Sequence, residues 1–351
     1  MNSLFRFVRA RHRAARKAAN LLIASALALG LAAPAFAEPP LDKTEIRYQG
    51  WAGQVTFIEL ADDLGYLAPL KLKWVGNTIS GPQDIQTVVT GDIDIGGAFY
   101  GAILKLIAVK APIKAVVGYY GSDDNTYNGY YVKADSPIRT ARDLIGKKVA
   151  VNTLGAHLEF VLREYLARNG LTPAEAKQVM LVAIPPVSGE QALRQGQVEV
   201  TTLNGVLRDK ALERGGIRSL FADTDLFGNF TGGSYVLRDK FIRDNPEASR
   251  KLIEGVSRAI AWAQTTPPED VRARFERIIS ERKRNEDATP IKYWKSTGVA
   301  SKGGLISDAE IQVWIDWLEK DGLFKPGQIK ASDTYTNAFN YFRPGKTAEA
   351  Q

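Results

Sequence analysis

The 351-residue sequence contains no cysteine, which excludes disulfides, zinc–thiolate sites, iron–sulfur clusters and thiol nucleophiles. It has only two histidines, His12 and His157, and it lacks the G-x-S-x-G and H-E-x-x-H motifs. Serine or carboxylate catalysis stays open, but no spacing in the chain proposes it. We therefore expect a protein that is not an enzyme and that uses no cofactor and no metal ion.

Acidic residues are also missing from the first 37 positions, where six Arg and Lys side chains precede an apolar run from about 18 to 33. Ala35-Phe36-Ala37 follows as an A-x-A cleavage site, so residues 1–37 are predicted to be a cleavable secretory signal peptide. The alternative is an uncleaved membrane anchor, but the run is shorter than the ~20 residues that a span requires.

Most of the positive net charge of the chain comes from the predicted signal peptide. Lys plus Arg falls from 46 to 40 when its six basic residues are removed, while Asp plus Glu stays at 39, so the net charge drops from +7 to +1. A nucleic-acid partner therefore has no electrostatic support. The basic run that contains Arg272, Arg274, Arg277, Arg282, Lys283 and Arg284 also includes glutamates and is interpreted as a solvated helix face.

Strand and helix patterns alternate from residue 45 onward. Strands are expected at 45–49, 70–74, 93–95 and 113–119, and Gly96-Gly97-Ala98 is expected to lead into a helix that runs to about Val109. This order predicts a mostly parallel sheet with helices on both faces.

A second α/β unit begins with the strand at 147–151 and the long amphipathic helix after Gly155. Chain crossings at 130–132 and 235–237 would join the two units. The predicted domains are a first lobe of 38–131 plus 235–342, a second lobe of 132–234, and a loose tail of 343–351.

One stretch resembles a known family. Asp135-Ser136-Pro137-Ile138, followed by the DLIGKKVAV run at 143–151, is similar to a signature of periplasmic solute-binding proteins of ABC importers. The run from Gly81 to Gly96 and the NGLTP segment at 169–173 match it too. The resemblance extends from about Ile46 to Phe342, and the most similar branch handles nitrate, taurine, aliphatic sulfonates and thiamine-precursor pyrimidines.

The resemblance implies a type II periplasmic binding protein, with two open-sheet α/β lobes joined by a two-strand hinge. It would bind a small organic anion of the sulfonate or nitrate type and deliver it to an ABC permease in the inner membrane. We expect a periplasmic monomer. Three alternatives stay open: a heteroaromatic or other non-sulfonate ligand, a sensor that presents its closed form to a receptor, and a pyrimidine-precursor synthase, disfavoured because that enzyme uses cysteines.

Three helix starts should face the cleft between the lobes, because ligands collect at the carboxyl ends of strands in open sheets. Free N–H groups and partial positive charge at such starts suit an anion, although the same segments can be ordinary strand–helix turns. Aromatic side chains near strand ends, with Trp51 and Phe230 the best candidates, would hold the ligand's body. The predicted ligand-binding residues are Gln49, Trp51, Ser80, Gly81, Ala98, Tyr100, Thr153, Gly155, Ala156, His157, Asn204 and Phe230.

The chain departs from the sulfonate branch at two of these places. At the start of the long helix the sulfonate branch has a sequence that resembles Gly-Ser-Ser-Ala-His, whereas this chain has Thr153-Leu154-Gly155-Ala156-His157. In the next loop of the second lobe the family often has Trp-Asp-Pro-Tyr, whereas this chain has Leu203-Asn204-Gly205-Val206. This chain therefore lacks the aspartate in that loop that would pair with an amine, which argues against a taurine-like zwitterion as the ligand. The pair Asp92 and Asp94 and the segment 123–125 lack the glycine and terminal glutamate of a calcium loop, so both are interpreted as turns.

Overall fold

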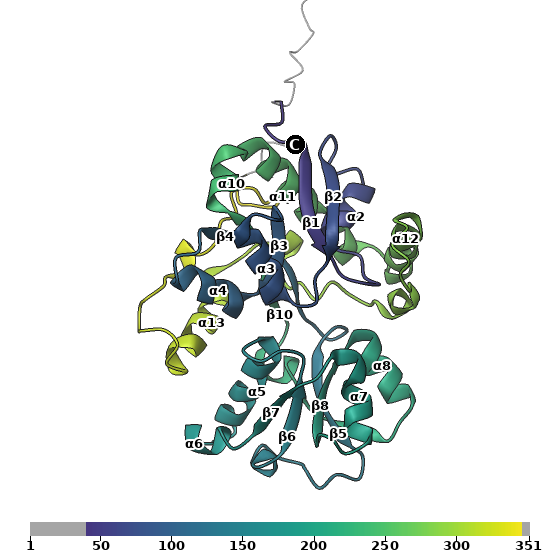
Figure 1. Ribbon diagram of the computed structural model, residues 1–351, viewed down its shortest axis with the longest axis vertical. Helices are drawn as coiled ribbons and strands as arrows, with labels where there is room; N and C mark the ends of the chain where they lie inside the picture. The colour runs from purple at the N-terminus through teal and green to yellow at the C-terminus, as the bar shows by residue number, and fades with distance from the viewer. Residues whose placement is uncertain (1–39, 346–351) are drawn as a thin grey trace, which may run out of the picture. The chain divides into compact units, whose positions relative to one another are not determined.

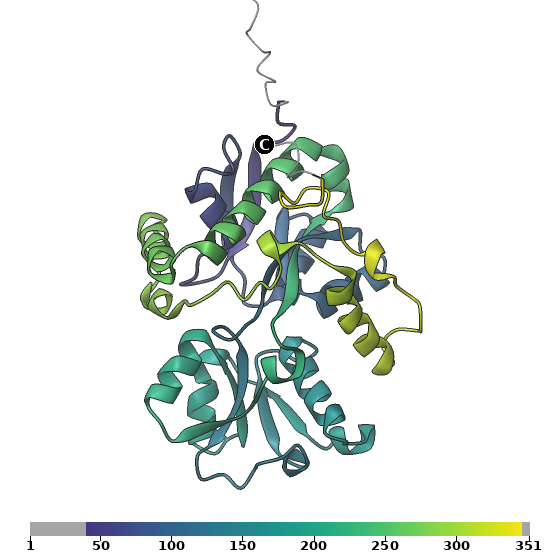
Figure 2. The same ribbon diagram turned by 180° about the vertical axis from the view of Figure 1, so that it is seen from behind.

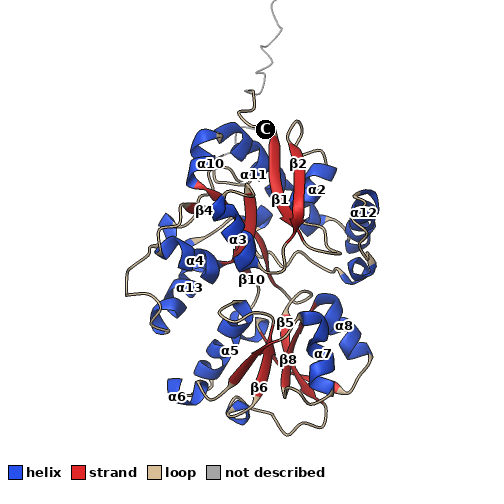
Figure 3. Ribbon diagram, viewed as in Figure 1, coloured by secondary structure: helices blue, strands red, loops and turns tan. Residues whose placement is uncertain are grey.

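Two five-stranded β-sheets, each flanked by helices, form the framework of the protein (Figures 1 and 3). The computed structural model describes residues 40–345. The predicted signal peptide and residues 346–351 of the predicted tail lie outside the described residues. None of the helices within 40–345 is long and apolar enough to cross a membrane.

The first sheet has the strand order β2-β1-β3-β10-β4. Strand β1 pairs in parallel with β2 and β3, whereas β10 runs antiparallel to both β3 and β4. The strands β1, β2, β3 and β4 therefore all run in one direction, as the prediction of a mostly parallel sheet requires, and β10, which returns from the second sheet, is the one antiparallel strand of the five. The strands are β1 (Glu45–Gly50), β2 (Lys71–Asn77), β3 (Ile95–Phe99), β4 (Ile113–Ser122) and β10 (Phe230–Arg238).

The second sheet repeats this plan in the order β7-β6-β8-β5-β9. Here β6 is parallel to β7 and β8, and β5 is antiparallel to β8 and β9. Alternate residues of β5 reach opposite faces, so Tyr130 joins the apolar cluster on one side and Tyr131 joins the cluster on the other. The strands are β5 (Asn128–Lys133), β6 (Lys148–Val151), β7 (Met180–Ala183), β8 (Val200–Asn204) and β9 (Ile217–Ala222).

Helices cover both faces of each sheet. In the first sheet, α2, α11 and α12 share one apolar cluster and α3, α4 and α13 share the other, and Figure 2 shows the long α11 lying across the sheet. Capping boxes begin α2 at Thr56 and α13 at Ser307. The helices of this part are α2 (Phe57–Asp63), α3 (Gly81–Thr90), α4 (Tyr100–Ala108), α10 (Asp239–Asp244), α11 (Pro246–Thr265), α12 (Pro268–Glu281) and α13 (Asp308–Lys320).

The second sheet is covered by α5 on one face and by α7 and α8 on the other. Helix α5 starts at His157, as its sequence pattern predicts, and buries Phe160, Val161 and Tyr165 on one face. The helices of this part are α5 (His157–Arg168), α6 (Pro173–Ala176), α7 (Pro186–Arg194), α8 (Gly205–Glu213) and α9 (Thr224–Phe227), and 3₁₀ turns occur at Arg142–Leu144, Thr289–Tyr293, Lys302–Gly304 and Ala331–Asp333.

The chain passes between the sheets twice, after β4 and before β10, and both boundaries differ from the predicted ones. The proposed crossing at 130–132 lies inside β5, and the one at 235–237 lies inside β10. The crossings are instead residues 123–127 and residues 223–229, which include the short helix α9. Each strand begins before its apolar run, β5 at Asn128 and β10 at Phe230 ahead of Thr231 and two glycines, so hydrophobic pattern alone does not locate where each strand begins.

The prediction that Gly96-Gly97-Ala98 lies outside the strand and leads into a helix is also wrong. These residues belong to β3, and the helix α4 starts only at Tyr100. A Cβ at Gly97 would lie 2.6 Å from the ring of Tyr119. The glycine is needed for close packing in the sheet, not for a turn.

Asp94 ties the end of α3 to β1. Its side chain is fully buried and accepts hydrogen bonds from Arg47 N at 2.9 Å, Nε at 3.2 Å and Nη2 at 2.8 Å. Burial alone would raise the pKa of this carboxyl, but the hydrogen bonds and charge of Arg47 outweigh it and hold the pKa below its usual range.

Replacing Asp94 with Ala should therefore leave the N–H groups of Arg47 N and Nε without this acceptor, while Arg47 Nη2 keeps the Gly91 carbonyl at 2.8 Å. We expect a loss of about 3 kcal/mol in the free energy of unfolding, measured by urea denaturation. Asp92→Ala, at an exposed neighbour whose carboxylate accepts from Thr90 Oγ1 at 2.7 Å, is the matched control and should change this free energy by less than about 1 kcal/mol. Equal losses in the two variants would contradict this role.

Candidate functional site

A cavity of about 730 Å³ is lined by residues from both sheets and from the chain crossings. Its walls include the ends of β1 and β4 and the start of α3 on the first sheet's side, and the starts of α5, α7 and α8 on the other. Its size suits a ligand of several to some tens of atoms. The carboxyl ends of the parallel strands therefore meet here, as expected for a ligand site in open α/β sheets.

Eight of the twelve predicted binding residues line this cavity: Trp51, Ser80, Gly81, Ala98, Thr153, Ala156, His157 and Asn204. The other four do not. Tyr100 is fully buried within α4, and Phe230 stacks on the His157 ring at 5.9 Å behind the wall. Gln49 is half-buried on β1 with its Oε1 atom unpartnered, and Gly155 is exposed beside the site.

The start of α3 is built around Gly81. A Cβ there would lie 2.9 Å from Ala98 Cα, so only glycine allows the helix to approach β3 this closely. The Ser80 hydroxyl caps the helix by accepting from Gln83 N at 3.4 Å, and Pro82 occupies the first turn. The Ser80 hydroxyl therefore bonds within α3, and the Gly81 N–H is the group at this helix start that is available to a ligand.

The start of α5 offers a different set of groups. The N-cap residue Ala156 makes no side-chain cap, so no side chain of its own satisfies the first N–H groups of α5. The Gly155 N–H, in contrast, donates to Glu159 Oε2 at 2.8 Å. The Gly155 N–H, which the sequence predicts to bind the anion, is therefore already bonded to a carboxylate of the same chain.

His157 connects the cavity to both crossings through Asp223. Asp223 is fully buried and accepts from Ser122 Oγ at 2.7 Å and from Asn128 Nδ2 at 2.7 Å, and His157 Nε2 lies 3.4 Å away. Burial would raise the pKa of this carboxyl, but these partners outweigh burial and lower it. The negative charge is thus held at the point where the two crossings meet.

Sequence reasoning missed one wall of the cavity, which is formed by residues 282–297, here called the strap. Pro290, Tyr293 and Trp294 of the strap line the cavity, as does Phe275 of α12. The strap has no strand or long helix, and its aromatic residues follow a charged run that reads as solvated. The clustering of Tyr293 and Trp294 after Pro290 was the only available signal.

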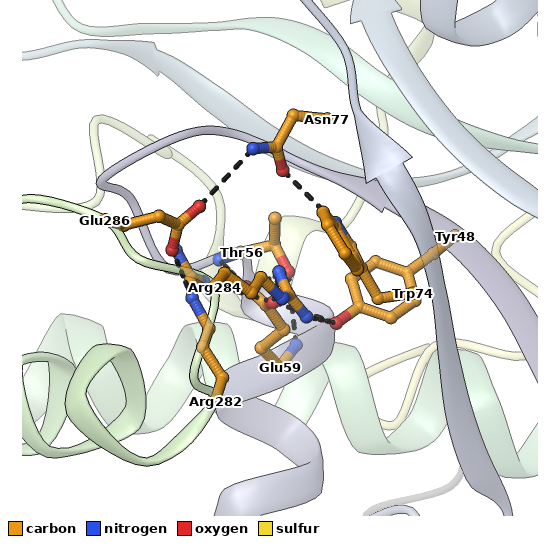
Figure 4. A network of polar contacts seen from close by, with 8 residues as sticks. All are labelled: Tyr48, Thr56, Glu59, Trp74, Asn77, Arg282, Arg284 and Glu286. Carbon is orange, nitrogen blue, oxygen red and sulfur yellow. Dashed lines mark hydrogen bonds and ion pairs between the residues drawn. The ribbon is translucent and has the colours of Figure 1, made fainter.

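Ion pairs fix the beginning of the strap to the first sheet (Figure 4). Arg282 Nη1 lies 3.1 Å from both oxygens of Glu59, and Arg284 Nη1 lies 2.9 Å from Oε1. Arg284 also donates to the Tyr48 hydroxyl at 2.7 Å and covers the ring of Trp74 at 4.4 Å. The interpretation of this basic run as a solvated face is therefore wrong for Arg282 and Arg284.

The end of the strap is fixed to the first crossing and to α8. Ser296 Oγ donates to Asp123 Oδ1 at 2.9 Å, and Lys295 Nζ lies 2.7 Å from Asp209 Oδ2. Asp209 also accepts from Arg208 Nε at 2.9 Å. The strap thus spans from the first sheet to the helix layer of the second.

No group of His, Asp and Glu side chains that could hold a metal ion occurs among residues 40–345. The acidic segment at the first crossing forms a turn, in which Asp123 Oδ1 accepts from the N–H groups of Asn125 and Thr126, each at 2.8 Å. Asp94 is occupied by Arg47.

Comparison of the sequence with known families gives a match over residues 53–270 to the family described as NMT1/THI5-like. A protein of Brucella abortus (strain 2308), provisionally described as a binding protein with no ligand named, is 25% identical over 240 residues. The alignment covers 65% of this chain and 71% of the relative.

Solved structures share the fold at low sequence identity. The periplasmic aliphatic sulphonate-binding protein SsuA of Escherichia coli has a TM-score of 0.63 at 22% identity, covering 84% of this chain and 92% of that one. The nitrate-binding protein NrtA of Synechocystis PCC 6803 has a TM-score of 0.61 at 15% identity, covering 83% and 85%. The predicted fold class, two α/β lobes of a type II periplasmic binding protein, is confirmed.

Asp84 of α3 lies behind the cavity wall, 4% exposed, and accepts from the Gly97 N–H at 2.7 Å while its Oδ1 atom has no partner. Burial raises its pKa to about 7, and the Gly97 hydrogen bond opposes the shift only partly. Because the folded-state pKa is raised, the stability from the protonated form is complete below about pH 4 and is lost as the pH rises through 7.

Asp84→Asn should remove this dependence, because the amide is uncharged at every pH. Between pH 4 and pH 8 the free energy of unfolding of the parent should fall by roughly 4 kcal/mol relative to the variant. Urea denaturation at several pH values measures this difference. A difference that stays constant across the range would show that Asp84 titrates normally.

Proposed function

The chain belongs to the NMT1/THI5-like family, and from this premise we propose that it is the solute-binding component of an ABC importer. It captures a small organic anion in the cavity and delivers it to a membrane permease. The observation that carries the proposal is the cavity of about 730 Å³ whose walls come from two sheets joined by two chain crossings. The binding proteins of similar fold support it, as does the predicted signal peptide, which would direct the chain to the periplasm.

Hinge closure is the proposed mechanism. A ligand that contacts both lobes stabilises the closed arrangement relative to the open one, and the permease recognises the closed form. The two crossings at 123–127 and 223–229 are the segments that would absorb the change in backbone angles. The protein acts as a monomer and catalyses no reaction in this proposal.

The charge of the cavity wall supports an anion over a cation. Among residues 40–345, no aspartate or glutamate lines it, and Lys295 is its one lysine. The starts of α3 and α5 add partial positive charge, and the Gly81 and His157 N–H groups are proposed to bind the ligand's polar head. Thr153 and Asn204 are proposed side-chain partners, and the Asn204 Nδ2 atom already donates to Asn128 Oδ1 at 3.1 Å.

Thermal shift measurements against sulfonates, nitrate, carboxylates, neutral heterocycles and amines test the proposal. A true ligand at 100 times its dissociation constant should stabilise the folded protein by about 2.7 kcal/mol. Binding of neutral or cationic compounds alone would disprove the anion assignment, and binding of no compound in any class would disprove the solute-binding function.

Ala156→Asp tests the α5 start directly. Aspartate is a favourable N-cap, so the helix should be preserved while its carboxylate occupies the N–H groups that the anion would use. We expect the affinity for an anionic ligand, measured by isothermal titration calorimetry, to fall more than tenfold. Ala156→Ser caps without charge and should stay within about threefold of the parent. Similar affinity in all three proteins would remove α5 from the site.

A further inference from the structure

The cavity wall is unusually rich in aromatic side chains. Ten of its 42 lining residues are aromatic, against 33 of 351 in the whole chain, which is an enrichment of roughly 2.5-fold. Several of these side chains are only partly buried and therefore keep surface available to a ligand: Trp51, Tyr119, Tyr120, Tyr127, Tyr293 and Trp294. Such a wall offers ring faces and edges to a flat apolar body.

Aromatic walls also suit ammonium groups, but the charges here argue against a cation. An aromatic cage for a cation gains from a free carboxylate nearby, but no carboxylate among residues 40–345 lines this cavity, and Asp223 behind it is already bonded to Ser122 and Asn128. Lys295 adds positive charge at the wall, although Asp209 at 2.7 Å pairs with it. A cation would lose its water shell without gaining a counter-charge.

Trp294 is held in place more firmly than a loop residue usually is. Its carbonyl oxygen accepts from Arg272 Nη1 at 3.0 Å, and its ring meets the Phe275 ring edge-on at 5.6 Å. The strap that carries it is anchored on one side by Arg284 and Glu59 and on the other by Ser296 and Asp123. A ring fixed before binding loses little conformational entropy when a ligand stacks on it.

We propose that the ligand carries an aromatic ring and no positive charge, and that Trp294 is the residue that selects for the ring. Arg284 is a positioning residue, because it acts through the strap rather than by touching the ligand. This inference rests on the proposed function and narrows its ligand class from small organic anions to aromatic carboxylates or sulfonates. The wall of Tyr119, Tyr120 and Tyr127 lies in the same cavity and completes the apolar surface.

The test uses isothermal titration calorimetry with pairs of compounds that differ only in the ring. Substituted benzoates and benzenesulfonates are each paired with the saturated cyclohexane counterpart, and linear alkanesulfonates and benzylamine complete the panel. We expect the aromatic member to bind roughly five- to tenfold more tightly than its saturated partner, and benzylamine not to bind. Trp294→Ala should abolish this preference, whereas Trp294→Phe should keep it.

Trp262→Phe is the matched control, because Trp262 is half-buried on α11 and does not line the cavity. This variant should prefer aromatic over saturated compounds to the same degree as the parent protein. Arg284→Lys keeps a charge for Glu59 but loses the contact with Tyr48, so it should lower the affinity for aromatic compounds and leave that for saturated ones unchanged.

Two outcomes would overturn the inference while leaving the proposed function intact: tight binding of alkanesulfonates or saturated acids without any preference for a ring, or an equal loss for both members of a pair in Trp294→Ala. A proportional loss for both members in Arg284→Lys would overturn the positioning role. Failure of every compound in this panel and in the thermal shift panel to bind would overturn the proposed function itself, whereas binding of nitrate alone would overturn only the inference.

Discussion

The buried carboxylate of Asp223 is the interaction on which the arrangement of the lobes depends. It lies at the beginning of the second crossing and accepts hydrogen bonds from Ser122 and Asn128, which bound the first. Its own N–H donates to the Asn128 carbonyl at 3.0 Å. A fully buried charge is tolerable only when donors surround it, and here those donors belong to the two segments that must stay adjacent. The crossings therefore meet at a fixed point, and the cavity lies beside it.

From that point the two sides of the cavity are held differently. On one side, α5 packs against α13 through Phe160 and Trp314, whose ring centres lie 4.2 Å apart, so apolar contact continues from one sheet's helices to the other's. On the other side, the strap connects the sheets through ion pairs and hydroxyl hydrogen bonds at its two ends. The Glu59 ion pairs at the first end are buried, so this end of the strap stays fixed to the first sheet.

The sequence predicted those features that depend on local pattern. The strand at β1, the helix start at His157 and the capping box at Ser307 follow from alternation, helical spacing and cap residues, and all three occur. Eight predicted residues also lie around one cavity, because the ends of parallel strands meet at one edge of a sheet. Local chemistry thus located the site without long-range information.

Features that depend on distant partners were not predictable in this way. Arg282 and Arg284 are read as solvated because their partner Glu59 lies more than 200 positions earlier in the chain. Gly97 is read as a turn residue because Tyr119, whose ring requires the missing Cβ, belongs to another strand. The antiparallel entry of β10 between β3 and β4 is likewise set by the return of the chain and not by its own residues.

Trp51 and Trp294 both line the cavity, although they come from β1's loop and from the strap. Indole emission is sensitive to the polarity and the quenching groups around it, so a bound solute would change the intrinsic tryptophan fluorescence of the protein. The chain therefore carries a built-in optical reporter of occupancy. The absence of cysteine adds that a single introduced thiol would accept a dye at one known position, which makes the scaffold suitable for a reagentless sensor.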